Sequence, residues 1–340
     1  MSRKTPPSCR PVGGAARARR RGATPDRRAG RPTPTGSPAP LDTCIIGILL
    51  GGHLGDTLIT TPLARQLVQE KGLTVKVTEH PSTRAAFANN PFVHDYTTSR
   101  GMALVPWLKG GGHVLQQLQR GLGVEVSDPP RPEVYLSREE RAWASTWLAE
   151  HVPARRKVCV LSPRAVTTAG RYEGADWDQV SLALQEEYAV VQPVLSAEGV
   201  HEGQPRQPRP GRRRHEGQTP GAIIAVDLPT RHYLALVAAA DLFVGVLSGG
   251  AHASAAFHVP AIVVVWPELA PRIKFPVDGL GIGEEFAYPT QAHLCTSSVT
   301  RSGFDGRALR DKISEALALE PVRPPRGVPP RDPGRRRSAG

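Results

Sequence analysis

Short, uninterrupted apolar runs alternate with longer amphipathic stretches along most of the chain. Runs without polar alternation, such as 44–50 and 260–266, are typical of strands buried on both faces of a parallel sheet. The stretch 57–72 places leucines and a valine on one stripe and ends on a glycine, which indicates an amphipathic helix. The chain therefore predicts an α/β protein.

The same reasoning places the remaining elements. Ser137 and Glu140 have the spacing of a capping box at a helix start. The helix that they begin carries Trp143, Trp147 and His151 on one face. Strands are expected at 44–50, 75–79, 93–97, 158–162, 189–195, 223–226, 241–246 and 260–266, and helices at 57–72, 83–88, 114–122, from Ser137 onward, and at 176–187, 230–240, 251–257 and 307–319.

The strand–helix alternation occurs twice, which predicts two Rossmann-like domains. We expect an N-terminal domain at 41–152 and a C-terminal domain at 153–320. Three further segments, 1–40, 197–221 and 321–340, are rich in Pro, Gly and Arg and poor in aromatic and β-branched residues. This composition predicts disordered tails and a disordered insert.

The charge of the chain is unevenly distributed. The 340 residues carry a formal net charge of +12, with 43 Lys and Arg against 31 Asp and Glu. Residues 1–40 contribute +9 and residues 321–340 contribute +5, which leaves the rest of the chain mildly acidic. A nucleic-acid partner reached through the Arg-rich tails is an alternative. A specific nucleic-acid-binding face on the folded part is not expected.

Other classes are excluded by what the sequence lacks. No apolar stretch reaches the 18 or more residues of a membrane span. The Arg20-Arg21 pair is followed by neither the apolar segment nor the cleavage site of an export signal. Four cysteines without CxxC spacing favour neither a zinc site nor a disulfide framework, and they suit a reducing cytoplasm.

A glycine-rich turn follows the first predicted strand. Asp56 would lie at the start of the next helix, either as an N-cap or as a general base. The turn fits a dinucleotide fingerprint poorly, and an NAD-dependent oxidoreductase with Glu79 on the ribose stays a runner-up. The candidate active-site loop comprises Gly51, Gly52, Gly55, Asp56 and Thr57.

A second glycine-rich turn follows the strand at 241–246. It leads into a helix of small residues, which is compatible with a close helix–sheet contact. It is equally compatible with an anion site, because a helix start offers free N–H groups and a partial positive charge. The candidate ligand-binding residues are Ser248, Gly249, Gly250 and His252.

Several segments together resemble one known family. They are Gly-Gly-His-Leu-Gly-Asp56 through Thr-Thr-Pro62, Asn90-Pro91-Phe92-Val93-His94-Asp95, Gly112-His113 through Val124, Ala239-Ala240-Asp241, Ser248-Gly249-Gly250-Ala251-His252 and Val259-Pro260-Ala261-Ile262. In this order the chain resembles glycosyltransferase family 9, the ADP-heptose:lipopolysaccharide heptosyltransferases. The resemblance implies the GT-B fold, two Rossmann-like domains facing a cleft.

The resemblance also implies an activity. It is an inverting transfer, without metal or other cofactor, of heptose or a related sugar from a nucleotide-diphospho-sugar such as ADP-heptose. The acceptor would be a saccharide or a lipopolysaccharide-type glycolipid, and the enzyme would be cytoplasmic or peripheral to the inner membrane. Asp56 matches the family's base, and the turn at 248–252 would hold the diphosphate. Arg171 lies near the sequence position at which the family carries a phosphate-binding lysine.

The chain departs from the family in three places. Leu247 stands where the family has an aspartate, the first domain is short between Ser99 and Gly112, and the insert 197–221 replaces a short connection. These departures motivate a second hypothesis, a catalytically degenerate GT-B protein that binds a nucleotide or a partner.

Overall fold

The computed structural model describes residues 43–47, 53–99, 112–164, 175–195, 218–265, 286, 288–295, 298–300 and 303–319. These residues all belong to the unit Leu41–Gly340. The tails 1–40 and 321–340, most of the insert 197–221 and nearly all of the short segment after Ser99 lie outside the described residues.

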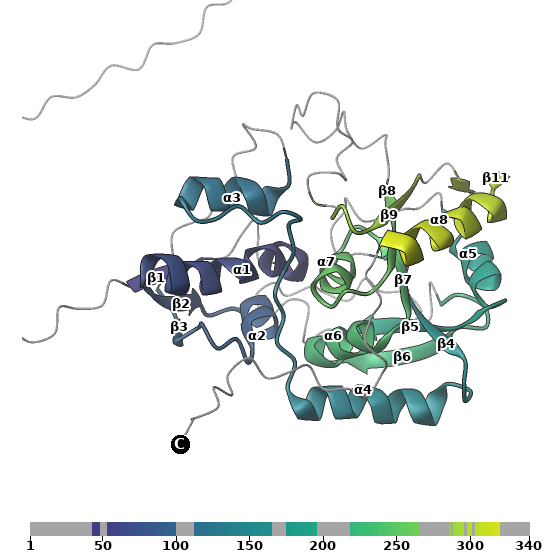
Figure 1. Cartoon of the computed structure of the whole chain (residues 1–340). Helices are drawn as coiled ribbons and strands as arrows, with labels where there is room; N and C mark the ends of the chain where they lie inside the picture. Colours follow the sequence, from purple (N-terminus) through teal and green to yellow (C-terminus); the bar gives the residue numbers. More distant parts are fainter. Residues whose placement is uncertain are drawn as a thin grey trace, which may run out of the picture. The chain divides into compact units, whose positions relative to one another are not determined.

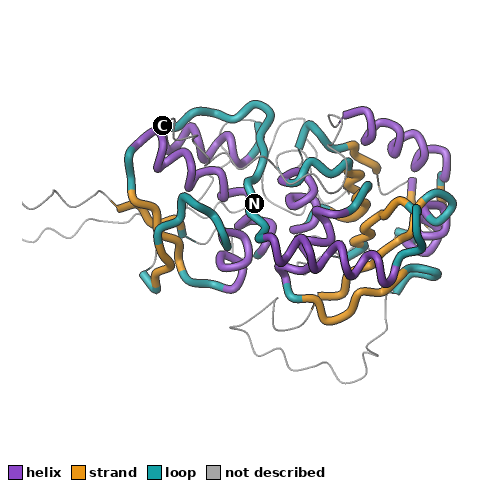
Figure 2. Tube along the Cα trace, turned by 60° about the horizontal axis from the view of Figure 1, so that its bottom comes forward, coloured by secondary structure: helices purple, strands orange, loops and turns teal. Residues whose placement is uncertain are grey.

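Most of the strands form two separate sheets (Figure 2). The first is a parallel sheet in the order β1-β2-β3, formed by β1 (Thr43–Ile46), β2 (Thr74–Thr78) and β3 (Asp95–Thr97). Its helices are α1 (Leu54–Lys71) and α2 (Pro81–Phe87), followed by α3 (Val114–Leu122) and α4 (Arg138–His151).

The larger sheet has six parallel strands in the order β6-β5-β4-β7-β8-β9. Counted from β4 as the first strand, this is the Rossmann order 3-2-1-4-5-6. The strands are β4 (Lys157–Ser162), β5 (Tyr188–Leu195), β6 (Ile223–Leu228), β7 (Leu242–Val246), β8 (Ala261–Val265) and β9 (Ala292–Cys295).

The helices of the larger sheet are α5 (Trp177–Leu184), α6 (Thr230–Ala239), α7 (Gly249–Ala256) and α8 (Gly306–Leu319). In Figure 1, α6 and α7 lie on one side of the sheet, and α5 and α8 lie on the other. A small antiparallel pair, β10 (Val299–Thr300) and β11 (Gly303–Phe304), precedes α8.

Alternate side chains of the central strands pack on opposite faces. Phe243 of β7 joins the buried cluster that contains α6 and α7, whereas Leu242 and Val244 join a second cluster with α5 and α8. Strands β7 and β8 are apolar along their whole length because both of their faces are buried, as the uninterrupted runs predicted. Full burial of such a side chain contributes roughly 1.5–3 kcal/mol.

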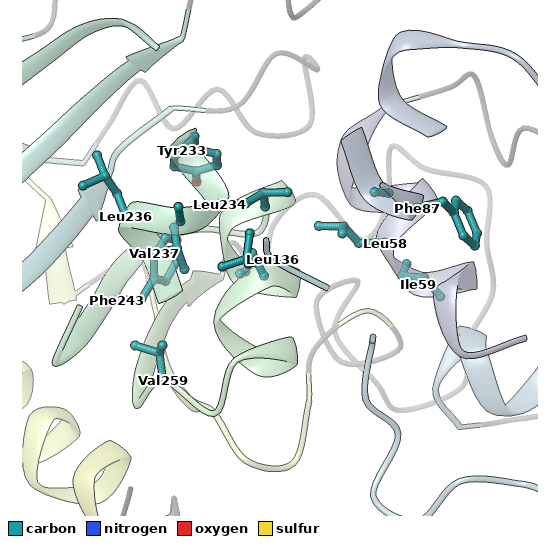
Figure 3. Close-up of a cluster of buried hydrophobic side chains, with 14 of the residues drawn as sticks. Leu58, Ile59, Phe87, Leu136, Tyr233, Leu234, Leu236, Val237, Phe243 and Val259 are labelled. Carbon is teal, nitrogen blue, oxygen red and sulfur yellow. The ribbon is translucent and has the colours of Figure 1, made fainter. Parts of the chain in front are cut away.

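The buried cluster on the α6 side continues into α1 and α2. Figure 3 shows Leu58 between Ile59 and Phe87 on one side and Leu136 and Leu234 on the other. Side chains of the three-stranded sheet and of the six-stranded sheet therefore belong to one buried cluster. The domain boundary near residue 152 stays a prediction.

Helix α4 packs against α6 although it precedes the predicted boundary. Its capping box is present, and the ring of Trp143 stacks on His232 of α6 at a centroid distance of 3.8 Å. Arg231 of α6 bonds to the carboxylate of Glu140 with one contact at 2.6 Å, and its guanidinium also donates to the carbonyls of Ala85 and Tyr135. One side chain thus connects α6, α4, α2 and the segment before α4.

Helix α1 contains Pro62 in its interior, which removes one N–H donor from the helix. The hydroxyl of Thr61 donates to the carbonyl of Leu58 at 2.7 Å, which is the acceptor that the missing N–H of residue 62 would have served. The same hydroxyl accepts from the backbone N–H of Glu133 at 2.9 Å. The helix therefore tolerates its proline and is tied to the segment before α4.

The sequence predicted most elements but placed some boundaries wrongly. Helix α1 begins at Leu54 rather than at residue 57, and α7 begins at Gly249 rather than at residue 251. Strands β9, β10 and β11 were not expected. They are two to four residues long, and none of them forms an uninterrupted apolar run in the sequence.

Candidate active site at the first turns of α1 and α7

The strand order reverses between β4 and β7, which pair in the middle of the larger sheet. In open α/β sheets, ligands bind outside the carboxyl ends of the strands at such a switch point. The second glycine-rich turn follows the carboxyl end of β7 directly, with Ser248 as the N-cap of α7. Topology alone therefore makes this turn a candidate binding site.

The turn is closely packed against the sheet. A methyl group added at Gly250 would lie 2.6 Å from the ring of Phe243 and would also meet the hydroxyl of Tyr233. No side chain larger than hydrogen fits there without displacement of these rings. The close helix–sheet contact that the sequence allowed is thus present. It places the first turn of α7 at the carboxyl end of β7.

Ser248 has a hydroxyl oxygen that is buried and has no hydrogen-bond partner among the described residues. It also makes no side-chain cap to α7. An unpartnered buried hydroxyl is uncommon and calls for an explanation, such as a bound ligand. The amides of the first turn of α7 are likewise not used within the helix, as at any helix start.

The first turn of α1 lies directly against the first turn of α7. A methyl group added at Gly55 would lie 3.3 Å from the backbone nitrogen of Gly249 and 2.9 Å from Cδ2 of His252. The side chain of Leu54, also in the first turn of α1, packs over Gly249 of α7. The two sequence-predicted turns are therefore brought together, and two helix N-termini with partial positive charge meet at one place.

Asp56 is in the first turn of α1. The N-cap interpretation is wrong, because the N-cap position belongs to His53, three residues earlier. Burial raises the pKa of Asp56 from its ordinary 3.8 to about 7. A helix N-terminus favours the carboxylate, whereas desolvation favours the neutral acid and is the cause of the raised pKa. A carboxyl group with a pKa near neutral pH is suited to accept a proton in a reaction.

His252 is 4% exposed. Its Nδ1 is 2.9 Å from the hydroxyl of Tyr288, and its Cδ2–Nε2 edge faces Gly55 of α1. Burial and the nearby His113 lower the pKa of His252 to about 3, so the imidazole is neutral at pH 7. The residue thus lies in the packed interface between α7 and α1.

The other predicted site residues differ in their placement. Thr57 is buried, and its hydroxyl donates to the carbonyl of His53 at 3.0 Å. Leu247 packs against the buried cluster on the α6 side. The carboxylate of Glu79, the candidate ribose ligand, is bound by Arg84. Gly51, Gly52 and Arg171 lie outside the described residues.

Sequence reasoning missed Tyr288 and Gln291. Both are buried, and the side-chain amide of Gln291 donates a hydrogen bond to the carbonyl of Ala251 in α7 at 2.6 Å. They lie in a stretch for which no element was expected, and no spacing links them to the glycine turns. His113 was quoted only as part of a resembling segment, and its ring lies 4.5 Å from that of Tyr288, centroid to centroid.

The described ranges contain no group of three or more His, Cys, Asp or Glu residues placed to hold a metal ion. Metal independence stays a prediction. Within the same ranges, every helix is too short or too polar to cross a membrane.

A scan against protein-family models and a search of the curated proteins found no match. Solved structures do match. The glycosyl transferase family 9 protein from Veillonella parvula DSM 2008 has a TM-score of 0.55 and 12% identity, over 82% of this chain and 98% of that chain. The E. coli ADP-heptose lps heptosyltransferase II has a TM-score of 0.50 and 12% identity, over 82% and 99%. At such identities the likeness concerns the fold, and the chain has the α/β fold of GT-B-type glycosyltransferases.

Proposed function

We propose that this protein is a glycosyltransferase of the family 9 type. It would transfer heptose or a related sugar from a nucleotide-diphospho-sugar, ADP-heptose in the first instance, to a saccharide or lipopolysaccharide-type acceptor. One observation carries the proposal: Asp56, a carboxyl group with a pKa of about 7, belongs to the first turn of α1, and that turn packs against the first turn of α7 beside the switch point of the larger sheet. The fold shared with two such transferases supports it.

The donor diphosphate would bind at the start of α7. The amides of Gly249 and Gly250 and the hydroxyl of Ser248 would donate to its oxygens, which accounts for the unpartnered Ser248 hydroxyl. The positive ends of two helices would stabilise the charge that develops on the leaving diphosphate. This is the contribution that a metal ion makes in other transferases, so the proposal includes no metal or cofactor.

The acceptor hydroxyl would approach from the side of Asp56. As its oxygen forms a bond to the anomeric carbon, Asp56 takes the hydroxyl proton, and the bond from that carbon to the diphosphate oxygen breaks. The nucleoside diphosphate leaves with the electron pair. A single displacement of this kind inverts the anomeric configuration. At pH 7 about half of the Asp56 side chains would be in the carboxylate form that can accept a proton.

The variant Asp56→Asn tests the mechanism, because it preserves shape while removing the base. We expect transfer from ADP-heptose to fall by at least about 100-fold, the lower range for a general base, while ADP binding persists. Product formation and ADP release should be measured together, with circular dichroism to check folding. Asp311→Asn, which removes an exposed carboxylate on α8, is the matched control. Undiminished transfer by Asp56→Asn would refute the mechanism.

Leu247 favours a second candidate, a GT-B protein that binds a nucleotide without turnover. In the resembled family an aspartate precedes this turn, whereas Leu247 packs against apolar side chains. Calorimetry with ADP and ADP-heptose, combined with a screen of acceptors, separates the two functions. Binding without transfer or hydrolysis would favour the second. A cytoplasmic location at the inner membrane belongs to the first proposal, since a glycolipid acceptor would lie there.

A further inference from the structure

A buried network connects Tyr288 to the candidate site. Tyr288 is 0% exposed, and its hydroxyl lies 2.9 Å from Nδ1 of His252. The two rings meet edge to face, with centroids 5.6 Å apart and planes at 89°. This geometry points the phenol hydroxyl at the edge of the imidazole, where a hydrogen bond sets the ring orientation.

Tyr288 is itself held in place from two sides. Gln291 accepts from the backbone N–H of Tyr288 at 3.3 Å and donates to the carbonyl of Ala251 in α7 at 2.6 Å. The ring of His113, at the start of α3, packs on the Tyr288 ring from another direction. The segment at 288–291 is therefore attached to α7, and its tyrosine has little freedom to turn away from His252.

The opposite edge of His252 faces α1. A methyl group at Gly55 would lie 3.3 Å from Nε2 of His252, and Asp56 is the next residue along the chain. Nε2 is thus beside the first turn of α7, and the proposed function places the diphosphate at the start of this helix. A proton on Nε2 would be a hydrogen-bond donor at that place.

The protonation of His252 and Tyr288 limits the ways in which their hydrogen bond can form. Burial lowers the pKa of His252 to about 3 and raises that of Tyr288 well above 10, so the imidazole is neutral and the phenol keeps its proton. Nδ1 of His252 and the Tyr288 hydroxyl are hydrogen-bonded, and either can be the donor, depending on the imidazole tautomer. If the phenol donates to Nδ1, the single imidazole proton resides on Nε2.

We propose that Tyr288 is a positioning residue that holds His252 as the Nε2–H tautomer, so that His252 donates a hydrogen bond to the diphosphate of the nucleotide-sugar. The inference rests on the proposed function for its ligand. It adds a role for a residue that no sequence motif marks, and it gives the buried His252 a defined protonation. Among the described residues, His113 before α3 is a further ionisable side chain near His252.

Tyr288→Phe removes only the hydroxyl and tests the inference. Imidazole ¹⁵N chemical shifts of the full chain, assigned by comparison with His252→Ala, report the tautomer directly. We expect the wild-type His252 to be protonated at Nε2 and not at Nδ1, and the Phe variant to show two exchanging tautomers. Tyr188→Phe is the matched control, because the Tyr188 hydroxyl is buried without a partner among the described residues.

Calorimetry with ADP provides the second measurement. We expect ADP affinity to fall about three- to tenfold in Tyr288→Phe and about ten- to 100-fold in His252→Ala, the range for losing hydrogen bonds to a charged ligand. Tyr188→Phe should bind as the wild type does. A wild-type Nδ1–H tautomer, or unchanged ADP affinity in both site variants, would overturn the inference alone. A wild-type protein that binds neither ADP nor ADP-heptose would overturn the proposed function as well.

Discussion

Asp56 lowers the free energy of unfolding at neutral pH, compared with an uncharged residue of the same shape at this position. The folded-state pKa of about 7 exceeds the ordinary 3.8, because burial disfavours the carboxylate. Between these two values the native state binds more protons than the unfolded state, so the free energy of unfolding decreases as pH rises. The full loss, reached above pH 7, is on the order of 4 kcal/mol.

Asp56→Asn removes this cost without a change of shape. We expect the variant to be more stable than the wild type by about 4 kcal/mol near pH 8 and by only about 1.5 kcal/mol near pH 5. Other titrating groups, including the buried His113 and His252, are common to both proteins and cancel in the difference. Urea unfolding followed by circular dichroism at several pH values measures it.

The pH dependence is the decisive feature of this experiment. A stability difference of the same size at every pH would mean that Asp56 titrates normally in the folded state. A less stable Asn variant near pH 8 would mean that the carboxylate has a stabilising partner. Either result would refute the argument that desolvation poises Asp56 as a base. Asp311→Asn reports the effect of removing a single exposed charge.

Four further substitutions test the packing of the fold, each by urea unfolding. Arg231→Met should cost about 2–3 kcal/mol, because it leaves the Glu140 carboxylate, whose side chain is only 17% exposed, without its cation; a change below about 0.5 kcal/mol would contradict this. Gly250→Ala should cost about 2–3 kcal/mol through its clash with aromatic rings, whereas Gly249→Ala, which meets a flexible leucine, should be nearly neutral; equal effects would count against the packing argument. Thr61→Val should cost about 1–3 kcal/mol by leaving two backbone groups unpaired, and an unchanged midpoint would show that they find other partners.

Much of the architecture could be predicted from local patterns. The apolar runs of β4, β7 and β8 predicted buried parallel strands, and the capping box at Ser137 predicted the start of α4. Both glycine turns were found because small residues at a strand–helix junction are a local signature. The predicted first residues of α1 and α7 were less accurate. Their N-cap residues, His53 and Ser248, make no side-chain hydrogen bond to the helix.

The chemistry of the site depends on contacts that no spacing along the chain encodes. Asp56 was a candidate base from the sequence, but its raised pKa comes from burial, which depends on what packs around it in three dimensions. His252 was equally a ligand or a packed residue until its contacts with Gly55 and Tyr288 were known. Local composition thus specified the strands, helices and glycine turns. Long-range packing brought the two turns together, partly buried Asp56 and placed Tyr288 beside His252, because desolvation and hydrogen bonding act between neighbours in space rather than in sequence.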